Sequence, residues 1–469
     1  MKVKKLMTFG ILVFFCQSCY LNPLINKALW LKDTNNNLLS QFLIALSRSQ
    51  SNSNTNSIAA SSIISLSQSS GIEGDTITIT GANFAADTVV TFGGNVIASL
   101  TSRTSNTIVT TVPVNGKSGT IKVTNSSVTA TSTTSFTVYR YFVYIPVGTN
   151  LEIYSFNPNT GAVSTVSGSP FSSTQGGYAD PTGKFMYATV FATAPNNVKG
   201  YTINSSTGVL SPTSVPLSSA NDSPTYSVFH PTGKFIFVNN YSSLDVSAFS
   251  IDQSTGNLTK INDFATGCSC ANLAQLRITP DGKYLYVNGN ASNNITGFSI
   301  NQTTGALSSI GTQGFAGFFD DALIDPNSSF LYSVSTTGTI SGFSINSGSG
   351  AITALSGSPF SGTANNMRGS MHPSGKYLYT VNIGGAQLAK HDIASDGTLS
   401  SPTTLSFGTN LQYVSIDPTG KYGFVNSGVS ANYYIFSIDQ TNGSTSLIPG
   451  NPFSISGVSG QISIIRIAQ

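Results

Sequence analysis

The chain has 469 residues, enough for more than one domain, and only 8% of them are charged. Its formal net charge of +3 equals the contribution of Lys2, Lys4 and Lys5, so the rest of the chain is neutral. No basic stripe and no run of alternating aromatic and cationic residues is available to hold phosphates, which excludes nucleic acid as the expected partner. The abundance of Ser, Thr, Asn and Gly is typical of an exported, turn-rich β protein.

Residues 1–18 have the layout of a secretory signal: lysines precede the apolar run Leu6 to Phe15, which is too short to span a bilayer. The run ends at Phe15-Cys16-Gln17-Ser18-Cys19, which resembles a lipoprotein signal. The resemblance implies lipid attachment at Cys19 and a location in the cell envelope, at the outer membrane or on its exposed face. The alternative is ordinary secretion, with Cys19 as a plain thiol.

Residues 19–59 are predicted to be a flexible tether. A short helix is conceivable between Leu24 and Leu46, where leucines recur around Trp30 and Phe42. The Ser/Asn run from Ser47 to Ser57 has too few apolar residues to build a core.

Residues 60–138 are predicted to form a small β-sandwich, because short strands alternate with turn residues. The run Gly71-Ile72-Glu73-Gly74-Asp75-Thr76-Ile77-Thr78-Ile79-Thr80-Gly81-Ala82-Asn83-Phe84 resembles the IPT/TIG immunoglobulin-like domain, as do Val90 to Gly94 and the Val112-Pro113 step. The resemblance implies a spacer or adhesive module without catalytic residues.

Residues 139–469 contain a turn that recurs every 45 to 50 residues. Each copy has the form Pro-x-Gly, with Ser328 in place of Gly in the fourth copy, followed by alternating aromatic and aliphatic residues. The prolines are Pro181, Pro231, Pro280, Pro326, Pro373 and Pro418. A second turn ending in Gly recurs seven times, at Gly161, Gly208, Gly256, Gly305, Gly350, Gly397 and Gly443. Short strands at this period predict an all-β fold, a β-propeller.

The first turn occurs six times and the second turn seven times, and this difference predicts how the ring closes. The C-terminal segment Gln461 to Ile467 can supply the inner strand that the first blade lacks, next to the strand Tyr141 to Ile145. Pairing the two ends in one blade removes both free sheet edges, so we expect a seven-bladed propeller.

The repeated Pro-x-Gly-Lys-aromatic-x-Tyr-Val-x-Asn pattern and the Ser-Ile-x-x-x-Thr-Gly-x-Leu turn make the propeller similar to the bacterial lactonase family, which includes 6-phosphogluconolactonase. The resemblance implies a lactone hydrolase. However, the family's catalytic His, acidic and Arg positions fall on Thr225, Asn240, Leu244 and Asp245 in one blade, and on Met367, Arg368 and Ile383 in a later one. Only Arg368 is retained, so no catalytic set is assigned.

The remaining reactive residues do not assemble a site. His230 and His372 belong to the turns, on the face away from the expected ligand-binding mouth, and His391 is expected to be exposed. Glu152 has no identifiable partner. Cys268 and Cys270 could form a strained disulfide or remain as unreactive thiols. No Cys or His lies near them in the sequence to complete a metal site. No motif indicates a cofactor.

The position five residues before each repeat proline is expected to ring the mouth of the central channel. It is occupied by Gly176, Tyr226, Gln275, Asp321, Arg368 and Tyr413, with Ile464 from the closing strand. Asp321 and Arg368 lie in adjacent blades, where they could pair with each other or share a polar ligand. The sequence therefore favours a non-enzymatic surface lipoprotein that binds a protein or carbohydrate at this mouth, with lactone hydrolysis as the alternative.

Overall fold

The computed structural model describes residues 60–469 except 127, 173–176, 191–196, 268–271, 291–293, 315–318, 336, 364–366, 409 and 458–459. The signal, Cys19 and the tether lie outside these residues, as do Gly176, Cys268 and Cys270. The described residues form strands, turns and connections, and none of them forms a helix long and apolar enough to cross a bilayer. The fold class is all-β, as expected.

An N-terminal sandwich packs two antiparallel sheets around one core. The first sheet has the order β1 (Ser62–Leu66), β3 (Thr76–Ala82), β7 (Thr107–Thr111), β6 (Leu100–Arg103). The second runs β9 (Val128–Val147), β8 (Lys117–Asn125), β4 (Val89–Gly93), β5 (Val96–Ala98), and β2 (Ser70–Ile72) pairs in parallel with β9. Alternating residues of β3, such as Ile77 and Ile79, are fully buried against Phe92 and Phe136, which is the period-2 pattern of a half-buried strand.

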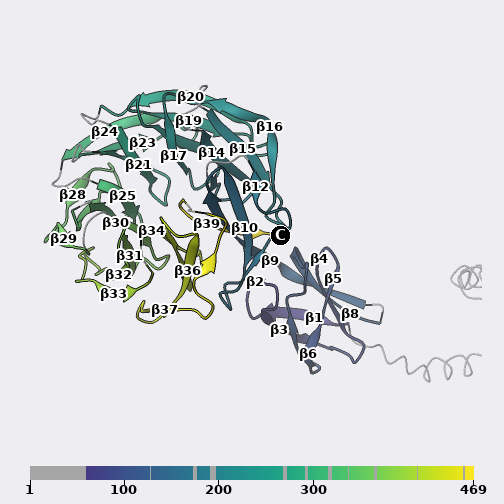
Figure 1. The fold of residues 1–469 in the computed structure, drawn as a ribbon. Helices are drawn as coiled ribbons and strands as arrows, with labels where there is room; N and C mark the ends of the chain where they lie inside the picture. The colour runs from purple at the N-terminus through teal and green to yellow at the C-terminus, as the bar shows by residue number, and fades with distance from the viewer. Residues whose placement is uncertain are drawn as a thin grey trace, which may run out of the picture. The chain divides into compact units, whose positions relative to one another are not determined.

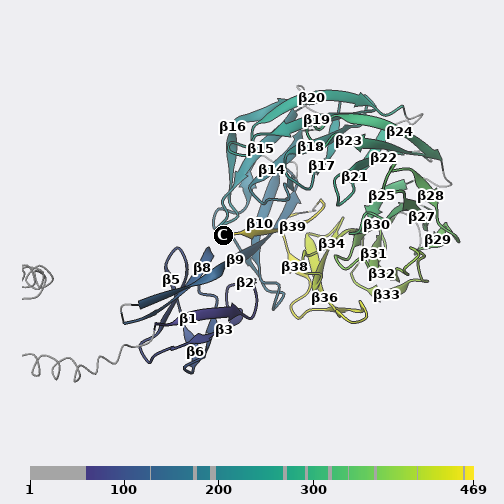
Figure 2. The same cartoon turned by 180° about the vertical axis from the view of Figure 1, so that it is seen from behind.

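Seven blades follow one another in chain order around a ring (Figures 1 and 2). The first blade contains the C-terminal half of β9 together with β10 (Asn150–Phe156), β11 (Val163–Thr165), β12 (Phe171–Ser172) and β39 (Ser463–Ala468). The second contains β13 (Tyr178–Ala179), β14 (Phe185–Val190), β15 (Asn197–Ile203) and β16 (Leu210–Ser219). The third contains β17 (Pro224–Phe229), β18 (Phe235–Asn240), β19 (Asp245–Ile251) and β20 (Leu258–Ala265).

The other four blades repeat this antiparallel order. The fourth contains β21 (Asn272–Ile278), β22 (Tyr284–Asn290), β23 (Asn294–Ile300) and β24 (Leu307–Gly314). The fifth contains β25 (Phe319–Ile324), β26 (Phe330–Ser335), β27 (Thr339–Ile345), β28 (Ile352–Ala354) and β29 (Phe360–Ser361). The sixth contains β30 (Met367–Met371), β31 (Tyr377–Asn382), β32 (Gln387–Asp392) and β33 (Thr403–Ser406). The seventh contains β34 (Leu411–Ile416), β35 (Tyr422–Ser427), β36 (Asn432–Ile438), β37 (Thr445–Leu447) and β38 (Phe453–Ser454).

The ring closes as the sequence predicts. β39 pairs antiparallel with β9 from Ser463 opposite Tyr144 to Ala468 opposite Tyr139. The two strands come from opposite ends of the propeller region, and Figure 1 shows yellow β39 beside blue β9. Closure within one blade leaves no unpaired inner edge where the ring begins and ends.

The two repeated turns are joined by hydrogen bonds between neighbouring blades. A tyrosine six residues after the repeat proline donates its hydroxyl to the carbonyl of the glycine that ends the next blade's second turn. Tyr187 bonds Gly256 at 2.7 Å, Tyr286 bonds Gly350 at 2.8 Å, and Tyr332 bonds Gly397 at 2.7 Å. Tyr144 plays the same part in the first blade and Tyr379 in the sixth. These bonds satisfy buried phenols, which is why the two motifs recur together.

Glycine is required in the Pro-x-Gly turns for two reasons. Gly282 has φ of +76° and Gly420 has φ of +74°, values that favour a residue without Cβ. A Cβ on Gly282 would also lie 2.4 Å from Nε2 of His230, and one on Gly420 would lie 2.5 Å from Nε2 of His372. Each turn is thus packed directly against the preceding blade.

Candidate functional site

The residues predicted at the mouth lie on the inner strands of five successive blades. Their strands are β17, β21, β25, β30 and β34, and each of these strands contacts the next around the ring. The five residues are Tyr226, Gln275, Asp321, Arg368 and Tyr413. Gln275 and Asp321 are buried, whereas Tyr226, Arg368 and Tyr413 are partly exposed. The repeat therefore places these residues on inner strands that are neighbours around the ring.

Asp321 forms a buried ion pair with Arg277 of the preceding blade. Arg277 Nη2 lies 2.6 Å from Asp321 Oδ1. The same oxygen accepts the N–H of Ala322 at 2.8 Å, and Oδ2 accepts the N–H of Gly369 at 3.3 Å. Burial raises the pKa of Asp321, and the charges of Arg277 and Arg368 and the N–H of Gly369 oppose that rise. Both carboxylate oxygens are engaged, so Asp321 holds the inner strands together and orients Arg277.

Arg368 stacks on an aromatic ring of the next blade. Its guanidinium carbon lies 4.1 Å from the centre of the Tyr413 ring, which is a cation–π geometry. Its charge also reaches Asp321. The expected proximity of Asp321 and Arg368 is thus present, but the ion pair of Asp321 is with Arg277.

Tyr178, Arg277 and Gln461 complete the site, and none of them was among the predicted site residues. Tyr178 donates its hydroxyl to Gln461 Oε1 at 3.2 Å. Burial raises the pKa of Tyr178, and Tyr226, Tyr413 and Asp321 add to the rise while Arg277 opposes it. Arg277 keeps 22% of its side chain exposed despite its ion pair. Tyr178 and Arg277 lie three residues before Pro181 and Pro280, respectively. This is two residues after the position predicted to form the mouth. Side chains two residues apart in a strand point to the same face, so the alternation of the strand could have predicted both residues.

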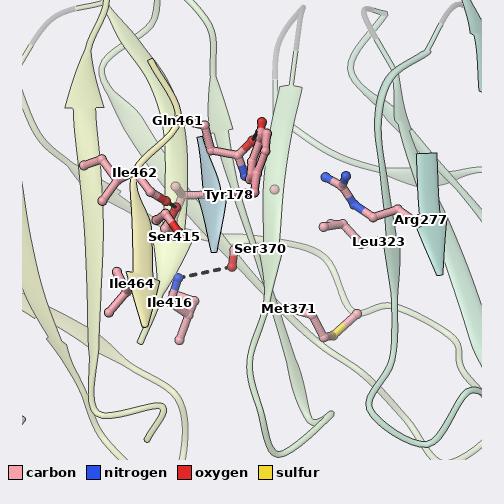
Figure 3. Close-up of a pocket in the computed structure, with 13 residues that line it drawn as sticks. Tyr178, Arg277, Leu323, Ser370, Met371, Ser415, Ile416, Gln461, Ile462 and Ile464 are labelled. Carbon is pink, nitrogen blue, oxygen red and sulfur yellow. Dashed lines mark hydrogen bonds between the residues drawn. The ribbon is translucent and has the colours of Figure 1, made fainter. Parts of the chain in front are cut away.

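These residues line one end of a cavity of about 300 Å³ inside the ring (Figure 3). The inner strands of the first, sixth and seventh blades supply most of the rest of the wall, including Ser370, Met371, Ser415, Ile416 and Ile464. In Figure 3, Tyr178 and Gln461 lie at one level of the cavity, with Arg277 across from them, and Met371 and Ile416 lie below. The site is therefore a concave pocket lined by both polar and aliphatic residues.

Gln275 adds a polar atom at the mouth level. Only 2% of the residue is exposed, and its Oε1 has no hydrogen-bond partner among the described residues. An amide oxygen left in this state is costly, because burial removes its water without a replacement. It is a candidate acceptor for a donor that is brought by a ligand.

The histidines lie apart from this site. His372 Nδ1 lies 2.7 Å from Ser374 Oγ, and its Nε2 donates to the Gly420 carbonyl at 2.9 Å. His230 is held by Thr232 and Gln302. The structural role expected for these two turn histidines is what the geometry shows. The expectation that His391 is exposed is wrong: it is fully buried in β32, where its ring packs inside the sixth blade and Nδ1 lies 3.2 Å from the Ser400 carbonyl.

Glu152 also has partners, contrary to the sequence interpretation. Its Oε2 accepts the hydroxyl of Tyr154 at 2.5 Å, and its Oε1 accepts the N–H of Ser456 at 2.7 Å. Ser456 is 304 residues away in the chain, so no local pattern could reveal this contact. Glu152 is a structural residue that links the first blade to the segment that follows β38.

Several of the positions that correspond to the lactonase catalytic set form a hydrogen-bond network around Asp245. Asp245 accepts the amides of Asn240 at 2.6 Å and Asn221 at 2.5 Å, together with the hydroxyl of Ser243. Thr225 donates its hydroxyl to Asn239. This network fixes the connections around β18 and β19. Within the part of the chain that the structure describes, no group of three or more His, Cys, Asp or Glu could hold a metal ion.

Comparisons with known proteins agree with this architecture. The family model "Lactonase, 7-bladed beta-propeller" matches residues 144–267, 178–358 and 322–410, which together span more than half of the chain. The IPT/TIG domain model matches residues 61–138. A search among curated proteins finds no match.

Solved structures share the propeller fold at low identity. A candidate 6-phosphogluconolactonase from Bacteroides fragilis is 22% identical, with a TM-score of 0.61 over 70% of this chain and 98% of its own. The periplasmic gluconolactonase PpgL of Pseudomonas aeruginosa is 16% identical, with a TM-score of 0.57 over 70% of this chain and 99% of its own. The chain therefore belongs to the lactonase family of seven-bladed β-propellers and carries an IPT/TIG domain ahead of the propeller.

Proposed function

We propose that this protein is an exported, lipid-anchored member of the cell envelope whose propeller binds a ligand at the channel mouth without turning it over. The ligand we favour is a carbohydrate or the sugar-like part of a larger molecule. A protein ligand that presents similar oxygen atoms is the other form of this proposal. Cys19 is the proposed site of lipid attachment.

The single observation that carries the proposal is the ring of aromatic and cationic side chains around the mouth. Tyr178, Tyr226 and Tyr413 offer flat apolar faces with hydroxyl groups, which suit the mixed apolar and polar surface of a sugar. Arg277 and Arg368 offer donors for hydroxyl and carboxylate oxygens.

The same geometry argues against hydrolysis at this mouth. A general base must reach the proton that it abstracts, but Asp321 is 3% exposed and both of its oxygens accept hydrogen bonds. The turn histidines are engaged elsewhere, and Thr225 stands at the family's His position while Asn240 and Leu244 stand at its acidic positions.

Lactone hydrolysis is the second candidate, because the chain belongs to the lactonase family and PpgL is described as a gluconolactonase. In this case Arg277 and Arg368 would polarise the lactone carbonyl. The discriminating measurement is acid release from gluconolactone and 6-phosphogluconolactone above the uncatalysed rate. Turnover that disappears in the Arg368→Ala protein would establish the enzyme and remove our proposal.

The binding proposal is tested with a panel of sugars and sugar acids, scored first by thermal shift. A ligand at one hundred times its Kd adds about 2.7 kcal/mol to the free energy of unfolding. We expect Arg368→Ala to weaken the binding of an acidic ligand at least tenfold, since a charge-assisted hydrogen bond contributes roughly 1.5–3 kcal/mol.

The matched control is Arg466→Ala. Arg466 also lies over a tyrosine, 4.4 Å from the centre of the Tyr139 ring, but it is exposed and is not among the residues that line the cavity. We expect Arg466→Ala to leave Kd within twofold of the wild-type value. Equal losses in the two variants would show that the effect does not come from the mouth.

A further inference from the structure

The last strand of the sandwich is also the second strand of the first blade. β9 pairs with β8 between residues 128 and 136, and it pairs with the ring-closing strand β39 between residues 139 and 144. β8 and β39 meet beside β9, where the N–H of Ser118 donates to the carbonyl of Gln469 at 2.9 Å. The N–H of Gln469 donates in turn to the carbonyl of Val138 at 2.8 Å. Main-chain hydrogen bonds therefore run from the sandwich into the strand that closes the ring.

A side chain of the sandwich also packs against the core of the propeller. Ile72 ends β2, the short strand that pairs in parallel with β9. It is half-buried and packs against the apolar cluster that contains Tyr141, Phe156 and Phe424 of the first and seventh blades. The core of the sandwich is a separate cluster, which includes Ile79. Burial of Ile72 thus stabilises the contact between the sandwich and the propeller.

Polar side chains of the sandwich reach the second turns of two neighbouring blades. Asp75 accepts the side-chain amide of Asn159, in the turn of the first blade, at 2.5 Å. Lys117 Nζ donates to the hydroxyl oxygen of Ser206, in the turn of the second blade, at 3.2 Å. Each of these bonds adds little stability by itself. Together they fix both blades to the same partner.

Arg140 and Gln469 link the sandwich, the second blade and the ring-closing strand. Arg140, on β9, donates to Asn115 Oδ1 of the sandwich at 3.0 Å and to the carbonyl of Ser206 at 2.5 Å. Gln469, the residue after β39, donates its side-chain amide to the carbonyl of Ser205 at 2.6 Å. The turn of the second blade is therefore held from β9 and from β39 at once.

We infer that the sandwich is an intramolecular clamp, which binds the turns of the first two blades and holds β39 in the closed ring. On the sandwich side the clamp consists of Ile72, Asp75, Asn115, Lys117 and Ser118. A spacer would need only the covalent connection through β9, and two domains joined in that way would move relative to each other. The clamp residues are separate from the wall of the cavity inside the ring, so the clamp and ligand binding can be tested independently.

The clamp is tested by hydrogen exchange on the full chain, read by mass spectrometry in peptides that cover β39. Ile72→Ala removes the apolar contact with the propeller. Arg140→Met removes the donors to Asn115 and Ser206 and keeps an unbranched apolar side chain. We expect each variant to speed the exchange of the β39 amides at least threefold, because local opening of the strand becomes easier.

Two control variants make matched changes away from the clamp. Leu100→Ala shortens a partly buried side chain that packs against the core of the sandwich itself. Lys390→Met removes a cation that bonds Asp392 and, across to the seventh blade, the carbonyl of Asn442. Both controls should leave the exchange of the β39 amides within twofold of the wild-type rate.

Calorimetry of the wild-type chain gives a second readout. A clamped sandwich and propeller should unfold in one transition, and two separate transitions would overturn the inference. Exchange at β39 that stays at the wild-type rate in both Ile72→Ala and Arg140→Met would overturn it as well. A sugar panel without any binder would remove the proposed function and leave the clamp in place, because the two rest on different residues.

Discussion

At the scale of single residues, the slot before each repeat proline shows how one position accepts different chemistry. It holds Asp180, His230, Thr279, Asp325, His372 and Asp417, and all six are buried. Asp325 accepts the N–H groups of Ser329 and Phe330, each at 2.6 Å. The histidines bond through the imidazole instead. What the slot requires is a hydrogen-bonding side chain for the turn, so a histidine found there is no evidence for acid–base catalysis.

The buried histidines make stability depend on pH. Burial lowers the pKa of His230, His372 and His391 below the ordinary value. All three are therefore neutral in the folded protein at a pH where the unfolded chain, with a pKa of about 6.5, begins to bind protons. The unfolded state binds more protons there, so the free energy of unfolding falls as pH drops from about 7 to 5. Each histidine contributes ~1.4 kcal/mol per unit of pKa depression.

The variant that checks this is His230→Thr with His372→Thr, because Thr279 occupies the same slot in the fourth blade and does not titrate. Between pH 7.5 and pH 5.0, the free energy of unfolding measured in urea should fall less for the variant than for the wild type. A loss of equal size in both proteins would mean that these histidines do not cause the acid sensitivity.

At the scale of elements, β39 is the strand on which the ring depends. It is the only part of the first blade that comes from the C-terminus, and it places Ile467 in a core with Ile153, Met186 and Tyr201. The tyrosine-to-glycine hydrogen bonds join five of the blades to the next one, but they cannot replace a missing inner strand. Loss of packing at β39 should thus be felt by the first two blades together.

The expected cost is measurable at one side chain. Ile467 is 3% exposed, and Ile467→Ala should lower the free energy of unfolding by about 2–5 kcal/mol through lost burial and the cavity that remains. Ile97, in the sandwich, is 68% exposed. Ile97→Ala should therefore change the free energy of unfolding by less than about 0.5 kcal/mol. Chemical denaturation of both variants compares the two sites, and similar small effects would show that β39 is not part of the stable core.

At the scale of the whole molecule, the proposed roles are divided between two parts of the chain: Cys19 would attach the protein to the membrane, and the propeller would bind the ligand. The three lysines that account for the net charge lie in the proposed signal, so the rest of the chain is neutral. A neutral chain gains no long-range attraction to an anionic membrane surface. Its retention in the envelope would depend on the lipid at Cys19, where two or three chains hold stably.

The anchor is tested by Cys19→Ser. We expect the wild-type protein to sediment with membranes and to incorporate labelled fatty acid, and the variant to lose the label. Ser18→Ala keeps a small residue before the cysteine and should be processed normally. Incorporation of label into the Cys19→Ser protein would contradict lipid attachment at this residue.

By itself, the sequence determined the two β domains, the seven blades and the closure by the C-terminal strand, because turn chemistry and period-2 alternation are local properties that repeat along the chain. It also indicated that Tyr226, Gln275, Asp321, Arg368 and Tyr413 occupy equivalent positions in successive blades, and they lie on the inner strands β17, β21, β25, β30 and β34. Only the tertiary structure decided that Asp321 pairs with Arg277, that Tyr178 meets Gln461, and that His391 is buried. These contacts join residues from different blades, up to 283 positions apart, and depend on how the blades pack, which no spacing in the sequence specifies.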